Sequence, residues 1–296
     1  MRADFQSWVA AHQARFEEVL RGLLPCADIA PQRLHLAMRY AVLDGGKRVR
    51  PLLAFAAGEL VGADVARANI AAAAVELIHA YSLVHDDMPC MDDDVLRRGK
   101  PTCHVQYGEA TALLVGDSLQ ALAFQLLAEH RLNDDVPRQL EMIKLLAVAS
   151  GSRGMAGGQA IDLDSVGKAL MLPELEFIHI HKTGALIRAA VLLGAQCGSV
   201  SAAQLVKLDH FGKCVGLAFQ VVDDVLDSEA DTATLGKTAG KDADNDKPTY
   251  VSLLGVQAAR DMAQQLHQEA LATLAEFGDA AQRLRELADF IVLRKF

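Results

Sequence analysis

Strand-like runs, in which polar and apolar residues alternate between turn residues, are scarce in this chain of 296 residues. Their scarcity argues against a fold built on β-sheets, because such alternation is typical of half-buried strands. Alanine, leucine and valine instead recur at three- and four-residue intervals, as on the apolar face of a helix. The sequence therefore predicts an all-α protein. Helices are expected near residues 4–24, 32–43, 51–61, 65–86, 105–130, 135–155, 173–197, 201–227, 247–276 and 279–293.

Linkers and shifts in composition are also missing, and no segment repeats another apart from two clusters of aspartate. Proline marks several helix boundaries. Pro31, Pro51 and Pro173 stand where a helix can begin, and Pro89 stands where one must end. We therefore predict a single domain over residues 1–296.

Cysteine patterns that bind metals are absent as well. The five cysteines are scattered, odd in number and without the spacing of metal ligands. They predict reduced thiols in a cytoplasmic protein and no zinc site. The first 20 residues mix charged and apolar side chains without a continuous apolar run, so we expect neither a signal peptide nor a membrane span.

Positive charge is in short supply, since 29 Lys and Arg against 38 Asp and Glu give a net charge of -9. A surface of this charge repels nucleic acid and anionic membranes, so we expect no nucleic-acid partner. Any polyanionic substrate must therefore be bound by a local cluster of Lys and Arg.

The chain is rich in aspartate at two places, each at the end of an apolar, alanine-rich stretch. The members are Asp86, Asp87 and residues 92–94 in the first cluster, and Asp223, Asp224 and Asp227 in the second. Carboxylates repel one another and resist leaving water, so a cation must compensate them. Magnesium usually takes one or two carboxylates per ion and completes its shell with waters and substrate phosphates. The clusters predict magnesium together with a phosphorylated ligand.

Helical spacing predicts how the clusters are arranged. His79, Ser82 and Asp86 share one face of the first helix, whereas Asp92 would point away from Asp86 if the helix continued. Because Pro89 ends the helix, the chain can swing Asp92 back.

The second cluster needs no such break. Gln220, Asp223, Asp224 and Asp227 follow one another at i, i+3, i+4 and i+7, which makes one polar stripe. Two helices with aspartates at one end can clamp metals between them.

Basic residues lie in glycine-containing segments beside both clusters: Lys47, Arg48, Arg50, Arg97, Arg98, Lys100, Lys182, Lys237, Lys241 and Lys247. Arginine binds phosphate oxygens in a bidentate fork and lysine binds them as a mobile point charge. Gly184 falls within an apolar helical run and would cost about 1 kcal/mol relative to alanine there. It predicts a kink or a close approach next to Lys182 and Thr183.

These motifs resemble those of a known family. HAYSLVHDDMPCMDDDVLRRGKPT is similar to the first aspartate-rich motif of the short-chain trans-prenyl diphosphate synthases, and FQVVDDVLD is similar to the second. GGKRVRP, GGQAIDL, HKTGAL and DTATLGKTAGKD resemble the remaining family blocks in the expected order. The resemblance runs from about residue 40 to the C-terminus. It implies the isoprenoid synthase fold, a central cavity and a homodimer.

The resemblance also implies roles for individual residues. The expected ligands of three magnesium ions are Asp86, Asp87, Asp92, Asp223 and Asp227. The expected contacts of the allylic diphosphate are Arg97, Lys182, Thr183, Gln220, Lys237 and Lys247, of which the first four are the expected catalytic residues. The expected pocket for isopentenyl diphosphate is Lys47, Arg50, His79 and Arg98.

The reaction that the resemblance implies joins isopentenyl diphosphate to dimethylallyl diphosphate and then to geranyl diphosphate by ionisation, condensation and elimination. Tyr81, five residues before Asp86, and the insertion at Pro89 and Cys90 resemble the bacterial farnesyl diphosphate synthase pattern, with small Ser82 beside Tyr81. An aromatic ring there stops the product at fifteen carbons. If Tyr81 points away, a geranylgeranyl product follows.

A different class shares one feature of this sequence. Glu76 and His79, like Glu176 and His179, form Glu-x-x-His pairs such as those of di-iron helical-bundle oxidoreductases. That alternative leaves both aspartate clusters and the basic segments unexplained.

Overall fold

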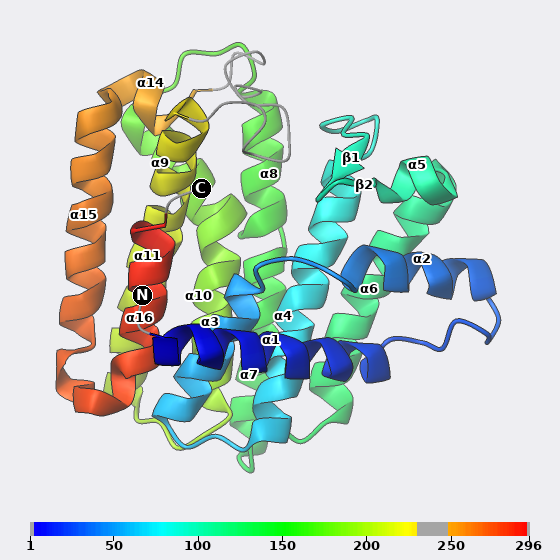
Figure 1. Ribbon diagram of the computed structural model, residues 1–296, viewed down its shortest axis with the longest axis horizontal. Coiled ribbons are helices and arrows are strands. Elements are labelled where there is room, and N and C mark those ends of the chain that lie inside the picture. The colour runs from blue at the N-terminus through cyan, green and yellow to red at the C-terminus, as the bar shows by residue number, and fades with distance from the viewer. Residues whose placement is uncertain (1–2, 230–247, 295–296) are drawn as a thin grey trace.

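The computed structural model describes residues 3–229 and 248–294, and most of these residues are helical (Figure 1). The long helices are α1 (Ala3–Leu23), α2 (Gln32–Val42), α3 (Val49–Leu60), α4 (Val65–Asp86), α6 (Glu109–Glu129), α7 (Val136–Ser150), α8 (Met155–Asp164), α9 (Leu172–His179), α10 (Ala185–Gln196), α11 (Ala202–Glu229), α15 (Val256–Thr273) and α16 (Gln282–Val292). The shorter elements are α5 (Cys103–Tyr107), the π-helix η1 (Ile180–Gly184), α14 (Tyr250–Leu254), the 3₁₀-helix η2 (Ala275–Ala281), and the paired strands β1 (Leu96–Arg97) and β2 (Lys100–Pro101). The all-α prediction is confirmed.

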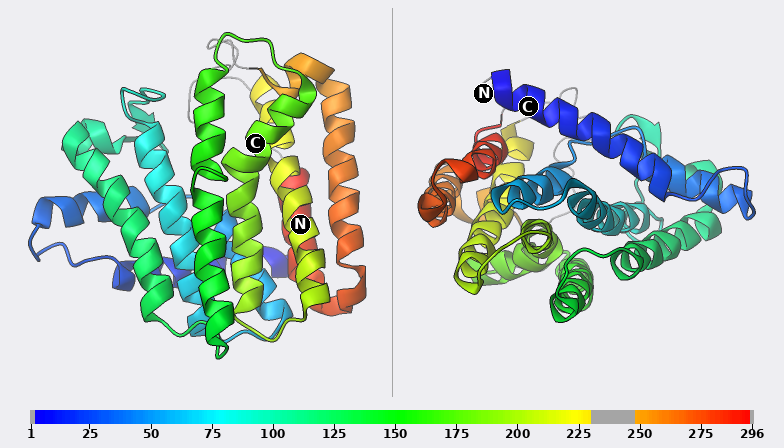
Figure 2. Two further views of the ribbon diagram at one scale, coloured as in Figure 1. Left: turned by 180° about the vertical axis from the view of Figure 1, so that it is seen from behind. Right: turned by 90° about the horizontal axis from the view of Figure 1, so that it is seen from below.

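Helices α4, α6, α8, α10, α11 and α15 stand side by side as an upright bundle, whereas α1 and α2 lie across it (Figures 1 and 2). Within the bundle α4 packs on α6, α3 packs on α10, and α11 packs on both α10 and α15. Helices α4 and α11 both run upward in Figure 1 and finish at its upper end. The bundle therefore presents the two aspartate clusters at the same end.

Helix α4 is a buried rod that sets the position of the first cluster. Asp64 caps its start, since the Asp64 carboxylate accepts hydrogen bonds from the backbone N–H groups of Ala66 and Arg67. The alanines at 71–74 are fully buried, and their small side chains let neighbouring helices approach closely. The helix has 22 residues, so it is about 33 Å long.

One cluster of buried apolar side chains reaches from Phe5 in α1 to Ile291 in α16. A smaller one, centred on Val221 and Tyr250, joins α11 to α14 and α15. Because the large cluster draws on both ends of the chain, we propose that residues 1–296 form one domain.

Glycine divides two of the predicted helices. The helices expected over 105–130 and 247–276 are each broken, at Gly108 and Gly255, whose φ angles are 87° and 82°. A positive φ angle interrupts the helical backbone, and glycine adopts it with little steric strain. The predicted extents were wrong at both places.

Helix α8 was not predicted at all. Two adjacent glycines, Gly157 and Gly158, weaken its helical pattern. The structure gives a reason for Gly158, because a Cβ there would overlap the backbone of Lys182. Gly158 therefore weakens the helical signal in the sequence and also allows the close packing of α8 against η1.

The departure from regular helix predicted at Gly184 is confirmed. Residues 180–184 form one turn of π-helix between α9 and α10. A Cβ on Gly216 of α11 would come within 2.8 Å of the Cα of Gly184, so the two backbones touch. Single π-helical turns occur frequently at functional sites.

A buried histidine makes the stability of this fold depend on pH. His179 is 9% exposed, packs its ring on Tyr250 at a centroid distance of 5.2 Å, and has a pKa that burial lowers from 6.5 to about 4. The unfolded chain takes up a proton below about pH 6.5, whereas folded His179 does so only below about pH 4. Stability is therefore lost as the pH falls from 6.5 to 4, by up to about 3 kcal/mol.

We expect His179→Gln to remove this part of the pH dependence. Urea unfolding of the variant at pH 7 and pH 4.5 should show a smaller loss of stability than the parent, by about 2 kcal/mol. The exposed His130 supplies a control, His130→Gln, which should behave as the parent does. Equal losses in the His179→Gln variant and the parent would show that His179 does not carry the effect.

Candidate active site

The chain folds back on itself directly after α4. The backbone N–H of Asp92 donates to the carbonyl of Asp86 at 2.8 Å, and the N–H of Asp94 donates to the carbonyl of Asp87 at 3.1 Å. The turn predicted at Pro89 is thereby confirmed, and Asp92 is brought next to the end of α4.

Asp86 is a half-buried carboxyl with an altered pKa of about 6, against an ordinary 3.8. Burial raises the pKa most, and the charges of Asp92 and Asp87 raise it further, while Lys182 and Arg97 oppose the rise. A carboxylate in this position gains from a nearby cation. The oxygen ligands that the fold gathers here therefore suit magnesium.

Asp86 opens into a cavity of about 400 Å³ between α3, α4, α8 and η1. The polar side chains on its wall are Arg50, His79, Ser82, His85, Asp86, Gln159, Lys182 and Thr183. The remainder of the wall includes Tyr81, Met91, Met155 and Leu163. The wall thus combines charged and apolar side chains, and it brings together seven of the residues named from the sequence: Arg50, His79, Tyr81, Ser82, Asp86, Lys182 and Thr183.

One hydrogen bond joins the polar stripe of α11 to the wall of this cavity. The hydroxyl of Thr183 in η1 donates to the side-chain oxygen of Gln220 in α11 at 3.2 Å. The charge of Asp223 also raises the pKa of Arg50, which lines the cavity, although burial lowers that pKa more. That both aspartate clusters converge on one site stays a prediction.

Asp224 holds the fold rather than facing the cavity. One of its carboxylate oxygens accepts from the Gln220 amide at 3.2 Å, and the other accepts from the backbone N–H of Tyr250 at 2.8 Å. Asp224 is 5% exposed. It ties α11 to α14 and so fixes the helix that carries Asp223 and Asp227.

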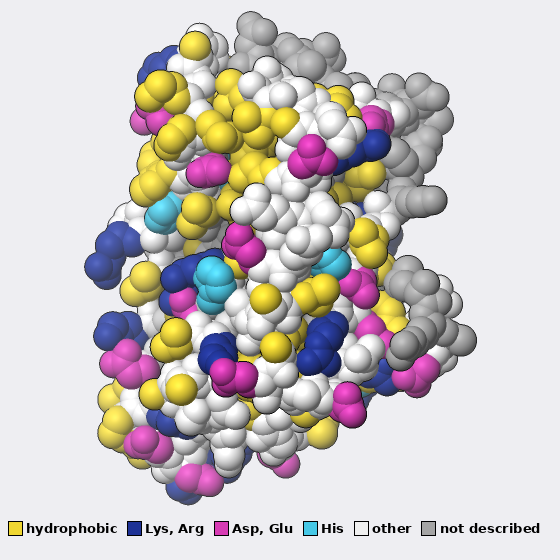
Figure 3. All heavy atoms as spheres, turned by 90° about the vertical axis from the view of Figure 1, so that its left-hand side faces the viewer, with side chains coloured by type: hydrophobic (Ala, Val, Ile, Leu, Met, Phe, Trp, Pro, Cys, Tyr) yellow, Lys and Arg dark blue, Asp and Glu magenta, His cyan; other side chains and the backbone are white. Residues whose placement is uncertain are grey.

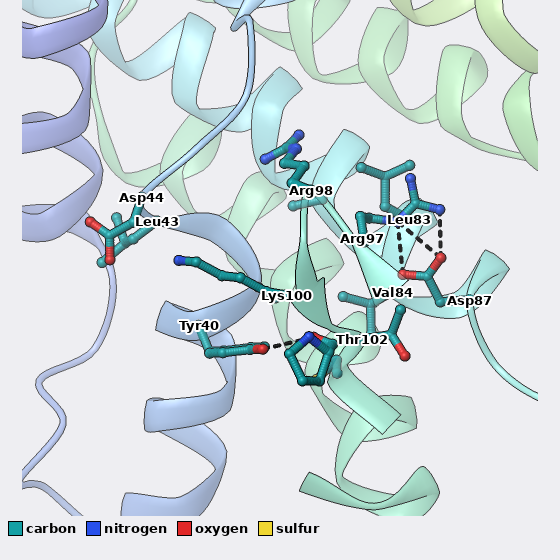
Figure 4. A pocket seen from close by; sticks show the side chains of 14 residues that line it. Tyr40, Leu43, Asp44, Leu83, Val84, Asp87, Arg97, Arg98, Lys100 and Thr102 are labelled. Atoms are coloured by element: carbon teal, nitrogen blue, oxygen red, sulfur yellow. Dashed lines mark hydrogen bonds and ion pairs between the residues drawn. The ribbon is translucent and has the colours of Figure 1, made fainter. Parts of the chain in front are cut away.

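Arg97 and Asp87 form a second group beside the cavity, in a small pocket of about 80 Å³ (Figure 4). The Arg97 Nε donates to both oxygens of Asp87, at 2.9 and 2.8 Å. Asp87 is 2% exposed, so the guanidinium compensates a buried charge. The structure places these two residues with each other and not on the wall that Asp86 and Lys182 share.

Arg98 lines the same small pocket and reaches back to the loop before α3. Its Nη1 donates to the carbonyl of Gly45 at 3.0 Å. A Cβ on Gly46, which has a φ of 101°, would come within 2.8 Å of the Arg98 guanidinium. The positive φ favours glycine there, whereas the steric conflict involves only the end of a flexible side chain, which can move aside. Lys47, in the same loop, has an exposed side chain.

His79 stands in a cationic environment. Its pKa is held well below 6.5, first by burial and then by the charges of Arg50, Arg98, Arg97 and Arg48. The positive charge of the arginines around this neutral imidazole favours an anionic ligand and disfavours a metal ion.

The neighbouring Glu76 is 3% exposed, and its carboxylate accepts from Arg48 Nη1 at 2.7 Å. This pairing uses the carboxylate that an iron site would need. The surroundings of Glu76 and His79 therefore argue against the di-iron alternative.

Three residues of this region were not singled out from the sequence. Asp162 of α8 holds the Lys182 ammonium at 2.7 Å. Gln159 of α8 has both side-chain polar atoms buried without a partner in the described chain. Arg294 pairs with Asp223 from near the C-terminus. The block GGQAIDL contains the first two, so the resemblance was a signal for them; nothing in the sequence links Arg294 to Asp223.

Two predicted contacts of the allylic diphosphate, Lys237 and Lys247, lie outside the described residues.

Comparison with known proteins supplies a family for this site. The family model for polyprenyl synthetase matches residues 31–287. The chain is 52% identical over 262 residues to the farnesyl diphosphate synthase of Escherichia coli strain K12, covering 87% of this chain and 88% of that enzyme. It is 48% identical over 266 residues to a chloroplastic geranylgeranyl pyrophosphate synthase of Catharanthus roseus, covering 89% of this chain and 74% of that enzyme.

Solved structures agree in fold. A geranyltransferase from Helicobacter pylori, complexed with magnesium and isoprenyl diphosphate, matches with a TM-score of 0.83 at 34% identity, covering 99% of this chain and 98% of that one. The all-helical architecture implied by the resemblance is thereby confirmed. On the family match and the extent of these identities, the chain belongs to the polyprenyl synthetase family.

Proposed function

We infer that this chain is a farnesyl diphosphate synthase, a prenyltransferase that condenses isopentenyl diphosphate with dimethylallyl and geranyl diphosphate. The observation that carries this function is one cavity whose wall includes the charged side chains of Asp86 and Lys182 together with the ring of Tyr81. The similarity to the Escherichia coli farnesyl diphosphate synthase supports the same activity.

We propose that three magnesium ions are held by Asp86, Asp87, Asp92, Asp223 and Asp227. When bound, magnesium supplies positive charge that neutralises the diphosphate as it leaves the allylic carbon. The Helicobacter pylori geranyltransferase that contains magnesium supports this choice of metal. Asp87 and Asp223 already lie beside Arg97 and Arg294, so protein cations share in compensating the carboxylates.

The protein's own groups act on the diphosphate and on the reacting carbon. Asp162 fixes the ammonium of Lys182 at the mouth of the cavity, where it can bind phosphate oxygens. The hydrogen-bonded pair of Thr183 and Gln220 orients two side-chain dipoles beside the allylic carbon, where positive charge develops. Met155 and the rest of the apolar wall keep water from the cation.

The second substrate, isopentenyl diphosphate, fits the arginine-rich side of the same cavity. Arg50 and neutral His79 line it, Arg98 lies alongside, and the exposed Lys47 can reach the diphosphate from the loop before α3. The Nε of Arg50 is buried without a partner in the described chain, so a bound phosphate would satisfy it. The proton released after condensation passes to the departing diphosphate.

The length of the product is set by the floor of the cavity. Tyr81 is 7% exposed and stands edge-on to the ring of His85 at a centroid distance of 5.8 Å. A buried ring packed in this way gives the cavity a fixed end. Similarity alone leaves the product open, because the geranylgeranyl synthase is nearly as close in sequence as the farnesyl synthase.

The surface of α6 supports a homodimer. Helix α6 is long and apolar enough to span a membrane, and 39% of its most apolar segment is buried inside the structure. The exposed apolar side chains on α6 and the adjoining α5 and α7 are Val105, Leu113, Leu114, Val136 and Leu140. Exposed apolar side chains on neighbouring helices are typical of an interaction surface. We propose that a second copy of the chain covers it and that α6 does not enter lipid.

We further propose that the enzyme works in the cytoplasm and binds no nucleic acid. All five cysteines are free thiols, as expected in a reducing compartment. The net charge of -9 disfavours polyanionic partners other than those met by the arginine-rich cavity.

The activity and the role of Asp86 can be tested together. Purified protein with magnesium, dimethylallyl diphosphate and labelled isopentenyl diphosphate should yield a fifteen-carbon product after dephosphorylation. Asp86→Asn should lower kcat/KM by roughly 100-fold, because it removes a charge that acts in the transition state. Asp93→Asn is the matched control: Asp93 is exposed, has a φ of 51° that asparagine tolerates, and should keep full activity. Full activity of Asp86→Asn would contradict the assignment.

Shortening the side chain at the cavity floor should lengthen the product. Tyr81→Ala opens space below Ser82 and is expected to shift the main product from fifteen to twenty carbons or more, measured by chromatography of the labelled alcohols. Tyr81→Phe keeps the ring and should retain the fifteen-carbon product. A fifteen-carbon product from Tyr81→Ala rules out Tyr81 as the floor, and a twenty-carbon product from the parent identifies a geranylgeranyl synthase.

The dimer is tested by charging its proposed interface. Light scattering should give twice the mass of one chain for the parent and the mass of one chain for the double variant Leu113→Glu/Leu114→Glu. A dimer of this variant would have to bury two added carboxylates from each copy, which costs free energy. Val206→Glu, at an exposed apolar residue of α11, should leave the mass unchanged. A dimeric double variant would place the interface elsewhere.

A further inference from the structure

A second cavity, of about 450 Å³, lies on the other side of the π-helix η1 from the active site. Thr183 lines the first cavity and Gly184 lines the second, so one turn of chain separates them. Helices α10, α11 and α15 form most of the second wall. Helix α15 belongs to the side of the molecule drawn in Figure 3, where acidic, basic and histidine side chains are mixed.

Three side chains at the rim of this second cavity bear metal-binding atoms. His210 and Cys214 lie one turn apart on α11, and Glu269 faces them from α15. The Cys214 sulfur is 3.8 Å from His210 Nε2 and 3.9 Å from Glu269 Oε2. All three ligand atoms fall within 4.8 Å of one another.

These separations are close to those of a tetrahedral zinc site. Zinc bonds of about 2.3 Å to sulfur and about 2.0 Å to nitrogen or oxygen place neighbouring ligands roughly 3.5 Å apart. The sulfur of Cys214 meets that spacing on both sides within a few tenths of an ångström. The other Glu269 oxygen accepts from Gln265 at 3.1 Å, which orients the carboxylate as partners of metal ligands do.

The order of the three groups does not suit a nucleophilic cysteine. In such a site the histidine stands between the thiol and the carboxylate and activates the thiol. Here Cys214 stands in the middle, and the pKa of its thiol is raised to about 11 by burial and by the charge of Glu269. The thiol is therefore protonated and unreactive unless a cation replaces its proton.

The basic residues near the site are already paired with a carboxylate, which reduces their repulsion of a bound cation. Asp209 pairs with both Arg188 and Lys213, the cavity's nearest basic residues on α10 and α11. A divalent ion with a thiolate, a carboxylate and a neutral imidazole forms a neutral group, which suits a partly buried place. The thiol proton passes to solvent when the ion binds.

We propose that His210, Cys214 and Glu269 form a site for a thiophilic divalent cation, best matched by zinc, with its fourth position open to the second cavity. The site is separate from the magnesium cluster, since Cys214 precedes Asp223 by nine residues, about 13 Å along α11. Magnesium does not compete for it, because thiolate is a poor ligand for that ion. An ion here links α11, which carries the second aspartate cluster, to α15.

The sequence alone predicted no zinc site. His210 and Cys214 are four residues apart, but Glu269 follows Cys214 by 55 residues. Only the packing of α11 on α15 brings the third ligand into place.

Cobalt, which absorbs strongly when bound to thiolate, is the probe that tests the site. The reference protein carries Cys26→Ser and Cys90→Ser, which remove the two exposed thiols, and is kept in excess magnesium to occupy the aspartate clusters. Cobalt chloride should then produce a thiolate-to-cobalt charge-transfer band, and zinc should abolish it. Zinc should also raise the melting temperature of the reference protein.

Variants in this background separate the site from chance binding. His210→Ala and Glu269→Gln change exposed residues, so both should fold, and each should weaken cobalt binding roughly tenfold or more. Cys214→Ser should remove the band, whereas His130→Ala, at an exposed histidine outside the site, should keep it. Absence of the band in the reference protein, or a band of unchanged affinity in both His210→Ala and Glu269→Gln, overturns the proposal.

Discussion

The need to compensate carboxylates at the ends of two largely buried helices governs the rest of this structure. Asp86 has its pKa raised to about 6 by burial and by the acidic residues next to it. Cations from distant parts of the chain compensate these carboxylates. Arg97 pairs with Asp87, Arg294 pairs with Asp223, and the charge of Lys182 acts on Asp86. Negative charge that these cations leave uncompensated would be met by magnesium, which we propose binds here together with an anionic diphosphate.

Close backbone contact puts those cations where they are needed. Gly158 lets α8 lie against the chain at Lys182, and α8 supplies Asp162, which holds the Lys182 ammonium. On the opposite side, Gly184 and Gly216 let the π-helical turn touch α11. Thr183 therefore stands within hydrogen-bonding distance of Gln220. The glycines allow the helices to approach closely, and this short distance between helices sets the positions of the side chains in the site.

Features that depend on neighbours in sequence were predictable. The helix before Pro89, the turn that returns Asp92, and the interruption at Gly184 each follow from local backbone chemistry, and each is confirmed. Features that depend on packing were not. Helix α8 has a weak helical sequence and exists because η1 accepts it, and the pair of Arg294 with Asp223 spans 71 residues. The contacts of Glu76 with Arg48 and of Glu269 with Cys214 belong to the same class, since no short motif joins them.

Under the proposed function, product length and chemistry are controlled by different parts of the same cavity. The charged groups of the cavity come from several helices at once, since Lys182 of η1 is held by Asp162 of α8. The floor that we propose is a single side chain on α4, the ring of Tyr81, which stands edge-on to His85. A change of one residue at this position alters volume without disturbing the charges above it. The farnesyl and geranylgeranyl synthases compared above are 52% and 48% identical to this chain, so overall identity does not by itself separate the two products.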